Sequence, residues 1–102
     1  MQIIKLNATD STNTYLKDLL AETRLADYSV VIAKNQTQGK GQRGEKWLSE
    51  KGKNLTVSIL KLKPKVALER QFLLNTIVSL SLIKTLEGYN VPNLAVKWPN
   101  DI

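Results

Sequence analysis

One long apolar helical segment limits the folds that are open to this chain of 102 residues. Between Val66 and Glu87, apolar residues recur at the three- and four-residue spacing of an α-helix. They are Leu68, Phe72, Leu73, Ile77, Leu80, Ile83 and Leu86. A helix with so wide an apolar stripe must cover a second layer, and a β-sheet is the expected partner. Gly88 and Asn90 then provide the residue types that end helices.

Shorter segments supply the strands of that sheet. The runs Gln2–Leu6, Ser29–Ala33, Leu55–Leu62 and Leu94–Trp98 are rich in β-branched or alternating apolar residues, and each predicts a strand. A further helix is expected over Ser11–Thr23. The order of strand, helix, strand, loop, strand, helix and strand predicts a sheet with helices packed on it.

The composition excludes several kinds of chemistry. The chain has no cysteine and no histidine, which excludes disulfides, thiolate metal sites and the usual general base. Its 15 lysines and arginines against 9 acidic residues give a charge of +6, which attracts nucleotides, nucleic acid or acidic protein surfaces. No apolar run approaches the roughly 20 residues of a membrane span, and no signal peptide is evident. We therefore expect a cytoplasmic protein without a membrane partner.

The polar stretch Lys34–Asn54 contains four of the five glycines and the most suggestive motif of the chain. Closely spaced glycines let backbone N–H groups approach an anion, while lysine and arginine add positive charge and tryptophan offers a flat surface to adenine. The motif consists of Gly39, Lys40, Gly41, Gln42, Arg43, Gly44, Glu45, Lys46 and Trp47. A flexible solvated loop has a similar composition, so this alternative stays open on composition alone.

Two shorter polar segments are also candidates. Ser11-Thr12-Asn13 places neutral donors and acceptors at a helix start, which suits either plain capping or an uncharged group such as a urea or amide. Lys97 at a strand end suits a phosphate, and Asp101 suits Mg²⁺ or a ligand hydroxyl. An ordinary turn after a strand explains the segment around Lys97 and Asp101 equally well when it is taken alone.

Taken together and in this order, the three segments resemble the biotin–protein ligase family. The resemblance rests on Asp10-Ser11-Thr12-Asn13, on the loop from Gly39 to Trp47, and on Lys97-Trp98-Pro99-Asn100-Asp101. It covers essentially the whole chain, and the last segment is the most specific. It implies an α+β fold with a mixed β-sheet, similar to that of class II aminoacyl-tRNA synthetases. Residues 1–102 would form the N-terminal part of the catalytic domain, which is incomplete without its C-terminal part.

The resemblance also implies a reaction and a set of roles. ATP with Mg²⁺ activates biotin to biotinyl-adenylate, and biotin then passes to a lysine of a biotin carboxyl carrier protein or of the biotin domain of a carboxylase. The implied biotin-binding residues are Ser11, Thr12, Asn13, Gln36, Lys40, Gly41 and Gln42. The implied ATP- and adenylate-binding residues are Gly39, Lys40, Gly41, Gln42, Arg43, Gly44, Trp47, Asn100 and Asp101. The implied catalytic residues are Lys40, Arg43 and Lys97, with Asp101 as the Mg²⁺ ligand.

Some features depart from the family pattern or leave alternatives open. The family usually has arginine where Lys40 and Gln42 stand, which puts retention of the adenylate in doubt. We expect the chain alone not to complete the reaction, and an unpaired sheet edge to favour a homo-oligomer. A lipoate–protein ligase or octanoyl transferase is the alternative within enzymes. A basic nucleic-acid-binding module is the alternative outside them, but the aromatic residues do not interleave with the basic ones, so nucleic acid is not the expected partner.

Overall fold

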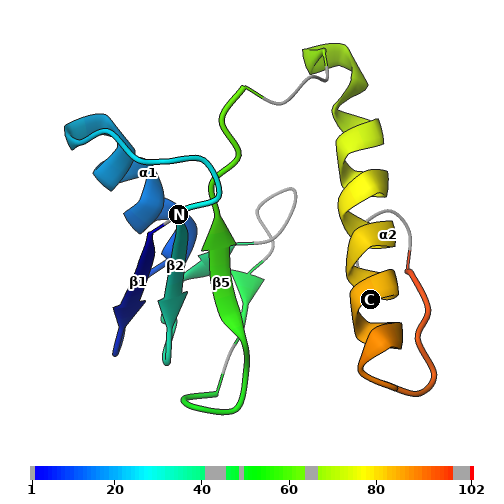
Figure 1. Cartoon of the computed structure of the whole chain (residues 1–102). Coiled ribbons are helices and arrows are strands. Elements are labelled where there is room, and N and C mark those ends of the chain that lie inside the picture. Colours follow the sequence, from blue (N-terminus) through cyan, green and yellow to red (C-terminus); the bar gives the residue numbers. More distant parts are fainter. Residues whose placement is uncertain (1, 41–45, 49, 64–66, 98–101) are drawn as a thin grey trace. The chain divides into compact units, whose positions relative to one another are not determined.

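The computed structural model describes residues 2–40, 46–48, 50–63, 67–97 and 102 (Figure 1). The chain divides into two compact units, Met1–Lys63 and Pro64–Ile102. Each unit is described by itself below. The first contains the sheet and the second contains the long helix.

The first unit is built on a three-stranded mixed sheet in the order β1-β2-β5. Strand β1 (Ile3–Leu6) is parallel to β2 (Val30–Ala33), and β2 is antiparallel to β5 (Thr56–Ile59). Parallel neighbours need a crossover, which helix α1 (Thr12–Glu22) provides between β1 and β2. The helix lies against β2 and β5 (Figure 1). The prediction of an α+β fold with a mixed sheet is confirmed, as are the first helix and the first three strands.

The core of this unit lies between α1 and one face of the sheet. Val31 and Ala33, two positions apart on β2, are 0% and 2% exposed, and Leu16 of α1 is 5% exposed. Strand alternation places Val31 and Ala33 on the same face. On β5 this face carries Ser58, which pairs with Val31 in the sheet register. The covered face of β5 is therefore polar at its centre.

The opposite face of the sheet is mostly apolar, with Lys5 of β1 also on it, and it is open at the two edge strands. Ile3, Val30 and Ile59 are paired in register across β1, β2 and β5. Ile3 is 51% exposed and Ile59 is 60% exposed. The alternation of Leu55, Val57 and Ile59 predicted a strand correctly, but this apolar side of β5 is the one that faces away from α1.

Between β2 and β5 the chain makes a long excursion whose ends are joined. The backbone N–H of Gly52 donates to the carbonyl oxygen of Lys34 over 3.0 Å. Gly52 has φ of +75°, a left-handed conformation that glycine adopts without a steric penalty. The excursion was predicted as a loop, and it contains a short antiparallel ladder of β3 (Gly39–Lys40) and β4 (Lys46–Trp47).

The second unit is dominated by helix α2 (Gln71–Gly88), which a 3₁₀ turn at Leu68–Arg70 precedes. The long helix predicted from the sequence is confirmed, although its regular part begins later. After Gly88, Asn90 has φ of 59°, and Val91 N–H donates to the Leu86 carbonyl oxygen over 3.2 Å, which closes the helix end. Among the described residues, no helix is long and apolar enough to cross a membrane.

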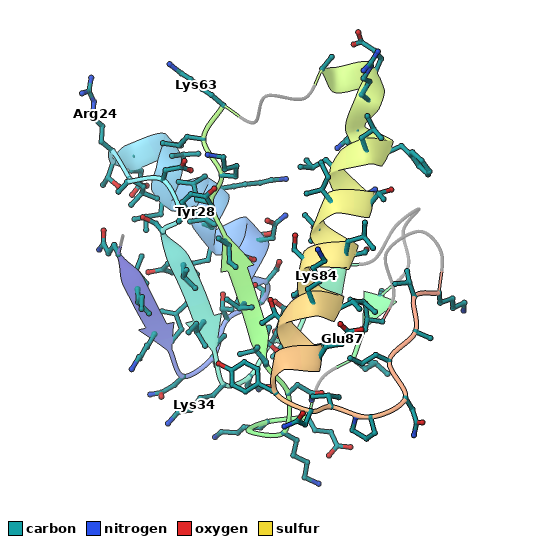
Figure 2. The ribbon with its side chains drawn as sticks, turned by 45° about the vertical axis from the view of Figure 1, so that its right-hand side comes forward. Arg24, Tyr28, Lys34, Lys63, Lys84 and Glu87 are labelled. Carbon is teal, nitrogen blue, oxygen red and sulfur yellow. The ribbon has the colours of Figure 1, made fainter. Side chains whose placement is uncertain are left out.

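The side chains of α2 depart from the single stripe that was expected. At 100° per residue, its apolar positions fall on every side of the helix axis. They are Phe72, Leu73, Leu74, Ile77, Val78, Leu80, Leu82, Ile83 and Leu86. A helix that is apolar all round is suited to burial on more than one side. Lys84 and Glu87, labelled in Figure 2, add charge only near its C-terminal end.

The prediction of a strand over Leu94–Trp98 is wrong for most of that segment. Residues 94–96 have no strand structure, and Lys97 forms only a single bridge. Trp98 lies outside the described residues. An alternating sequence shows which residues suit a strand, but it does not show whether a neighbouring strand supplies the hydrogen bonds.

A charged corner joins the start of β2 to the chain that follows β5. Asp27 accepts hydrogen bonds from the backbone N–H groups of Leu62 (2.7 Å) and Tyr28 (3.2 Å), and its other oxygen pairs with Lys61 Nζ at 2.5 Å. Lys61 Nζ also lies 4.7 Å from the centroid of the Tyr28 ring. Figure 2 shows Tyr28 and Lys34 at opposite ends of β2. The Lys61 hydrogen bond, followed by that of Leu62, lowers the pKa of Asp27.

We expect an Asp27→Asn variant to be less stable than the wild type near pH 7, because the lowered pKa means that folding favours the ionised carboxylate. This stabilisation is present above the ordinary pKa of 3.8 and is lost as the pH falls through the lower folded-state pKa. The difference in urea midpoint should therefore shrink below about pH 4. As the control, Glu50→Gln breaks an exposed pair with Lys53 and should change little. A difference that persists unchanged to pH 2 would contradict this account.

We expect Gly52→Ala to destabilise the first unit by about 1–2 kcal/mol, since an added Cβ makes the left-handed backbone conformation costly. An added Cβ would meet no atom within 4 Å, so a steric clash would not be the cause. Gly88→Ala is the matched control, because its added Cβ also meets nothing and alanine is favoured in a helix by about 0.5–1 kcal/mol. Chemical denaturation of both variants provides the measurement. Equal effects of the two substitutions would exclude the backbone explanation.

Candidate functional site

The site begins where the parallel pairing of β1 and β2 continues beyond the ends of both strands. Thr9 and Gln36 form a parallel bridge. Beyond it, Thr37 N–H donates to the Thr9 carbonyl oxygen over 3.0 Å, and Gln38 N–H donates to the backbone carbonyl oxygen of Asp10 over 2.7 Å. The segment after β2 thus runs beside the segment that leads into α1. This pairing brings Gln36 to the first turn of the helix.

Three side chains meet there in a group that we call the hydroxyl–amide cluster: Thr12, Gln36 and Ser58. Gln36 Oε1 accepts from the backbone N–H of Thr12 at 2.9 Å and from the Thr12 hydroxyl at 3.3 Å. Thr12 Oγ1 lies 2.8 Å from Ser58 Oγ. Thr12 is only 3% exposed, so these hydrogen bonds are partly shielded from water.

The donors of Thr12 determine the orientation of the Gln36 amide. A backbone N–H can only donate, so the group that faces it must be the carbonyl oxygen and not the NH₂ group. The NH₂ group consequently points away from the first turn of α1. An open depression of about 300 Å³, the neutral hollow, adjoins this cluster and is lined by Thr12, Gln36, Leu48, Asn54, Leu55, Thr56 and Val57.

The structure places four of the residues predicted to bind biotin, Ser11, Thr12, Asn13 and Gln36, at different positions. Thr12 and Gln36 are brought together at the neutral hollow. Ser11 is buried and caps α1, because its Oγ accepts from Thr14 N–H at 3.3 Å. Asn13 is exposed on the first turn of α1. Ser58 was not predicted, and its only sequence signal is a serine in an otherwise β-branched strand.

A second depression of about 300 Å³, the basic hollow, is lined by Thr37, Gln38, Gly39, Lys40, Lys46 and Leu48. Leu48 lines both hollows. Lys40 and Lys46 stand directly opposite each other in the β3–β4 ladder. Like charges in this position repel each other. Within the described part of the chain neither lysine has a carboxylate partner, so a bound anion would relieve the repulsion. Lys46 was not among the predicted site residues.

The remaining predicted site residues stay predictions. Six of them lie outside the described residues: Gly41, Gln42, Arg43, Gly44, Asn100 and Asp101. Trp47 belongs to β4, and Lys97 belongs to the second unit. Among the described residues, no group of three or more acidic side chains could hold a metal ion. A site for Mg²⁺ at Asp101 therefore stays a prediction.

Comparisons with known proteins agree with the motifs. The model of the biotin/lipoate A/B protein ligase family matches residues 6–102. The bifunctional ligase/repressor BirA of Salmonella typhimurium is 35% identical over 100 residues, which are 95% of this chain and 29% of that protein.

Two solved structures are also similar. The biotin acetyl coenzyme A carboxylase synthetase of Helicobacter pylori, with bound biotinylated ATP, matches with a TM-score of 0.68 and 27% identity, over 96% of this chain and 46% of that one. The biotin protein ligase of Leishmania major, in complex with biotinyl-5-AMP, matches with a TM-score of 0.64 and 29% identity, over 78% of this chain and 31% of that one. The chain thus spans less than half the length of these relatives.

We expect Lys46→Gln to stabilise the protein by about 0.2–1 kcal/mol at low ionic strength, because it removes one of two opposed like charges. The gain should decrease with added salt. Pyrophosphate should raise the melting temperature of the wild type more than that of the variant. Lys17→Gln, an exposed lysine of α1, is the control for the loss of one charge. If both variants respond alike to salt and pyrophosphate, the opposed lysines are not an anion site.

Proposed function

The chain belongs to the biotin/lipoate A/B protein ligase family, and on this premise we propose that it forms part of an enzyme that activates biotin with ATP and transfers it to a carrier protein. The proposal depends mainly on one observation: a neutral hollow and a basic hollow adjoin at Leu48. Biotinyl-adenylate has the same division, since a neutral ureido ring and an anionic phosphate are joined in one molecule.

The neutral hollow suits the ureido ring of biotin. In this proposal the Gln36 NH₂ group donates to the ureido carbonyl oxygen, while Thr12 holds the amide carbonyl oxygen. An uncharged polar ligand gains from such fixed donors, because they are oriented before the ligand arrives. Leu48, Leu55 and Val57 add apolar surface to the same depression.

The basic hollow suits the phosphate. In the proposed first step, a carboxylate oxygen of biotin attacks the α-phosphorus of ATP, a new P–O bond forms, and the bond to the leaving pyrophosphate breaks. Negative charge spreads over the phosphate oxygens as this happens. Lys40 and Lys46 would offset that charge without any proton transfer, because the carboxylate nucleophile is already ionised at neutral pH.

In the second step, a lysine amine of the carrier protein attacks the acyl carbonyl carbon of the adenylate. An amide bond forms, AMP leaves and the amine loses a proton. We propose a biotin carboxyl carrier protein or a carboxylase biotin domain as the acceptor, in the cytoplasm. Mg²⁺ would arrive with the nucleotide phosphates and need few protein ligands, of which Asp101 is the candidate.

Ligation of lipoate is the second candidate, because the family description includes lipoate ligases. Lipoate has no ureido group, so the NH₂ group of Gln36 would find no ureido oxygen to donate to. The relatives named above for biotin favour the first candidate. Competition between biotin, lipoate and octanoate for the chain distinguishes the two.

We expect Gln36→Glu to separate ligand binding from folding. The carboxylate still accepts from Thr12 N–H, and a negative charge at a helix N-terminus is favourable, so stability should be kept. The NH₂ donor is lost and negative charge faces the ureido oxygen, so biotin binding should weaken by about tenfold or more. Calorimetric titration with biotin and thermal unfolding of both proteins provide the measurements.

Gln2→Glu is the matched control, since it makes the same change of side chain at an exposed position that lines neither hollow. It should leave the affinity for biotin within about twofold of the wild type. Preferential binding of lipoate or octanoate by the wild type would contradict the proposal. So would equal biotin affinity of Gln36→Glu and the wild type.

A further inference from the structure

We propose that Ser58 is a positioning residue for the ligand site: its hydroxyl orients Thr12, and Thr12 in turn orients the Gln36 amide. The inference deepens the proposed function and rests on it where biotin is concerned. None of the three segments that carried the sequence prediction contains Ser58. It is recognised only because β5 places it beside the first turn of α1.

The direction of the hydrogen bonds follows from counting protons. The Thr12 hydroxyl has one proton, and it is donated to Gln36 Oε1, which can only accept. With that proton donated to Gln36, Thr12 Oγ1 accepts in its 2.8 Å contact with Ser58, and we assign Ser58 as the donor. The cluster forms one directed chain from Ser58 through Thr12 to Gln36, in which each bond polarises the next.

The backbone of Ser58 is held in the sheet by more regular pairing than the backbone of Gln36. It lies within β5 and pairs with Val31, which is fully buried on the central strand. Gln36 lies beyond the end of β2, where an isolated bridge to Thr9 replaces the regular ladder. These hydrogen bonds thus fix the Gln36 side chain, at the margin of the sheet, relative to β5.

The role differs from that of a ligand contact. The neutral hollow is lined by Thr12, Gln36, Thr56 and Val57, and Ser58 is not among its lining residues. Thr56 and Val57 of β5 line the hollow, whereas the Ser58 hydroxyl contacts Thr12. Without the Ser58 proton, Thr12 Oγ1 loses a donor, its rotamer is less restrained, and the amide that depends on it is held by fewer hydrogen bonds.

The first experiment does not need a ligand. We expect Ser58→Ala to speed hydrogen exchange of the Thr12 backbone amide by about two- to tenfold, and to shift the NMR signals of the Gln36 side-chain NH₂. Ser58→Thr keeps the hydroxyl and should restore the slow exchange. Ser81→Ala on α2, which loses only a hydrogen bond to its own helix, is the matched control and should change neither signal. Unchanged Thr12 exchange in Ser58→Ala overturns the proposal.

The second experiment tests the link to ligand binding with a double-mutant cycle. Ser58→Ala should weaken biotin binding by about two- to tenfold in the wild-type background and have no effect when Gln36 is already replaced by alanine. Equal effects of Ser58→Ala in both backgrounds would mean that Ser58 acts independently of Gln36, which overturns the inference.

The two proposals fail in different ways. If no form of the chain binds biotin, the proposed function is contradicted, and the positioning role of Ser58 is decided by the exchange rate of Thr12 alone. If biotin binds equally to the wild type and to Ser58→Ala, the proposed function stands and the positioning role is overturned.

Discussion

The parallel pairing of β1 with β2 is the constraint on which the candidate site depends. Parallel strands end at the same edge of a sheet, and the helix that connects them begins at that edge. Here the pairing extends through the Thr9–Gln36 bridge until the segment after β2 reaches the start of α1. Residues 24 positions apart, Thr12 and Gln36, are therefore in hydrogen-bond contact.

This arrangement also solves a local problem of the helix. The first four N–H groups of an α-helix have no partner within it. Ser11 satisfies that of Thr14, and Gln36 satisfies that of Thr12 from another segment. The same amide that stabilises the helix start faces the neutral hollow. Because structure and binding share one side chain, only a substitution that keeps the acceptor oxygen can distinguish the two roles.

Periodicity and turn residues in the sequence were enough to locate α1, α2, β1, β2 and β5, since each depends on local patterns. The residues that local patterns missed are those whose role arises from pairing between segments. Ser58 reaches Thr12 because its register with Val31 turns it toward α1. Lys46 lines the basic hollow, where the β3–β4 ladder sets it opposite Lys40. The strand expected near Lys97 failed for the same reason, because a strand requires a partner that its own sequence does not specify.

The excursion between β2 and β5 supplies lining residues to two chemically different hollows. Its two ends are joined by the hydrogen bond from Gly52 to Lys34. Before this closure, the chain supplies Lys40 and Lys46 to the basic hollow and Leu48 to both hollows. After it, Asn54 and Leu55 complete the neutral hollow. A ligand that spans both hollows would contact residues before and after this closure, so its binding should stabilise the closed arrangement.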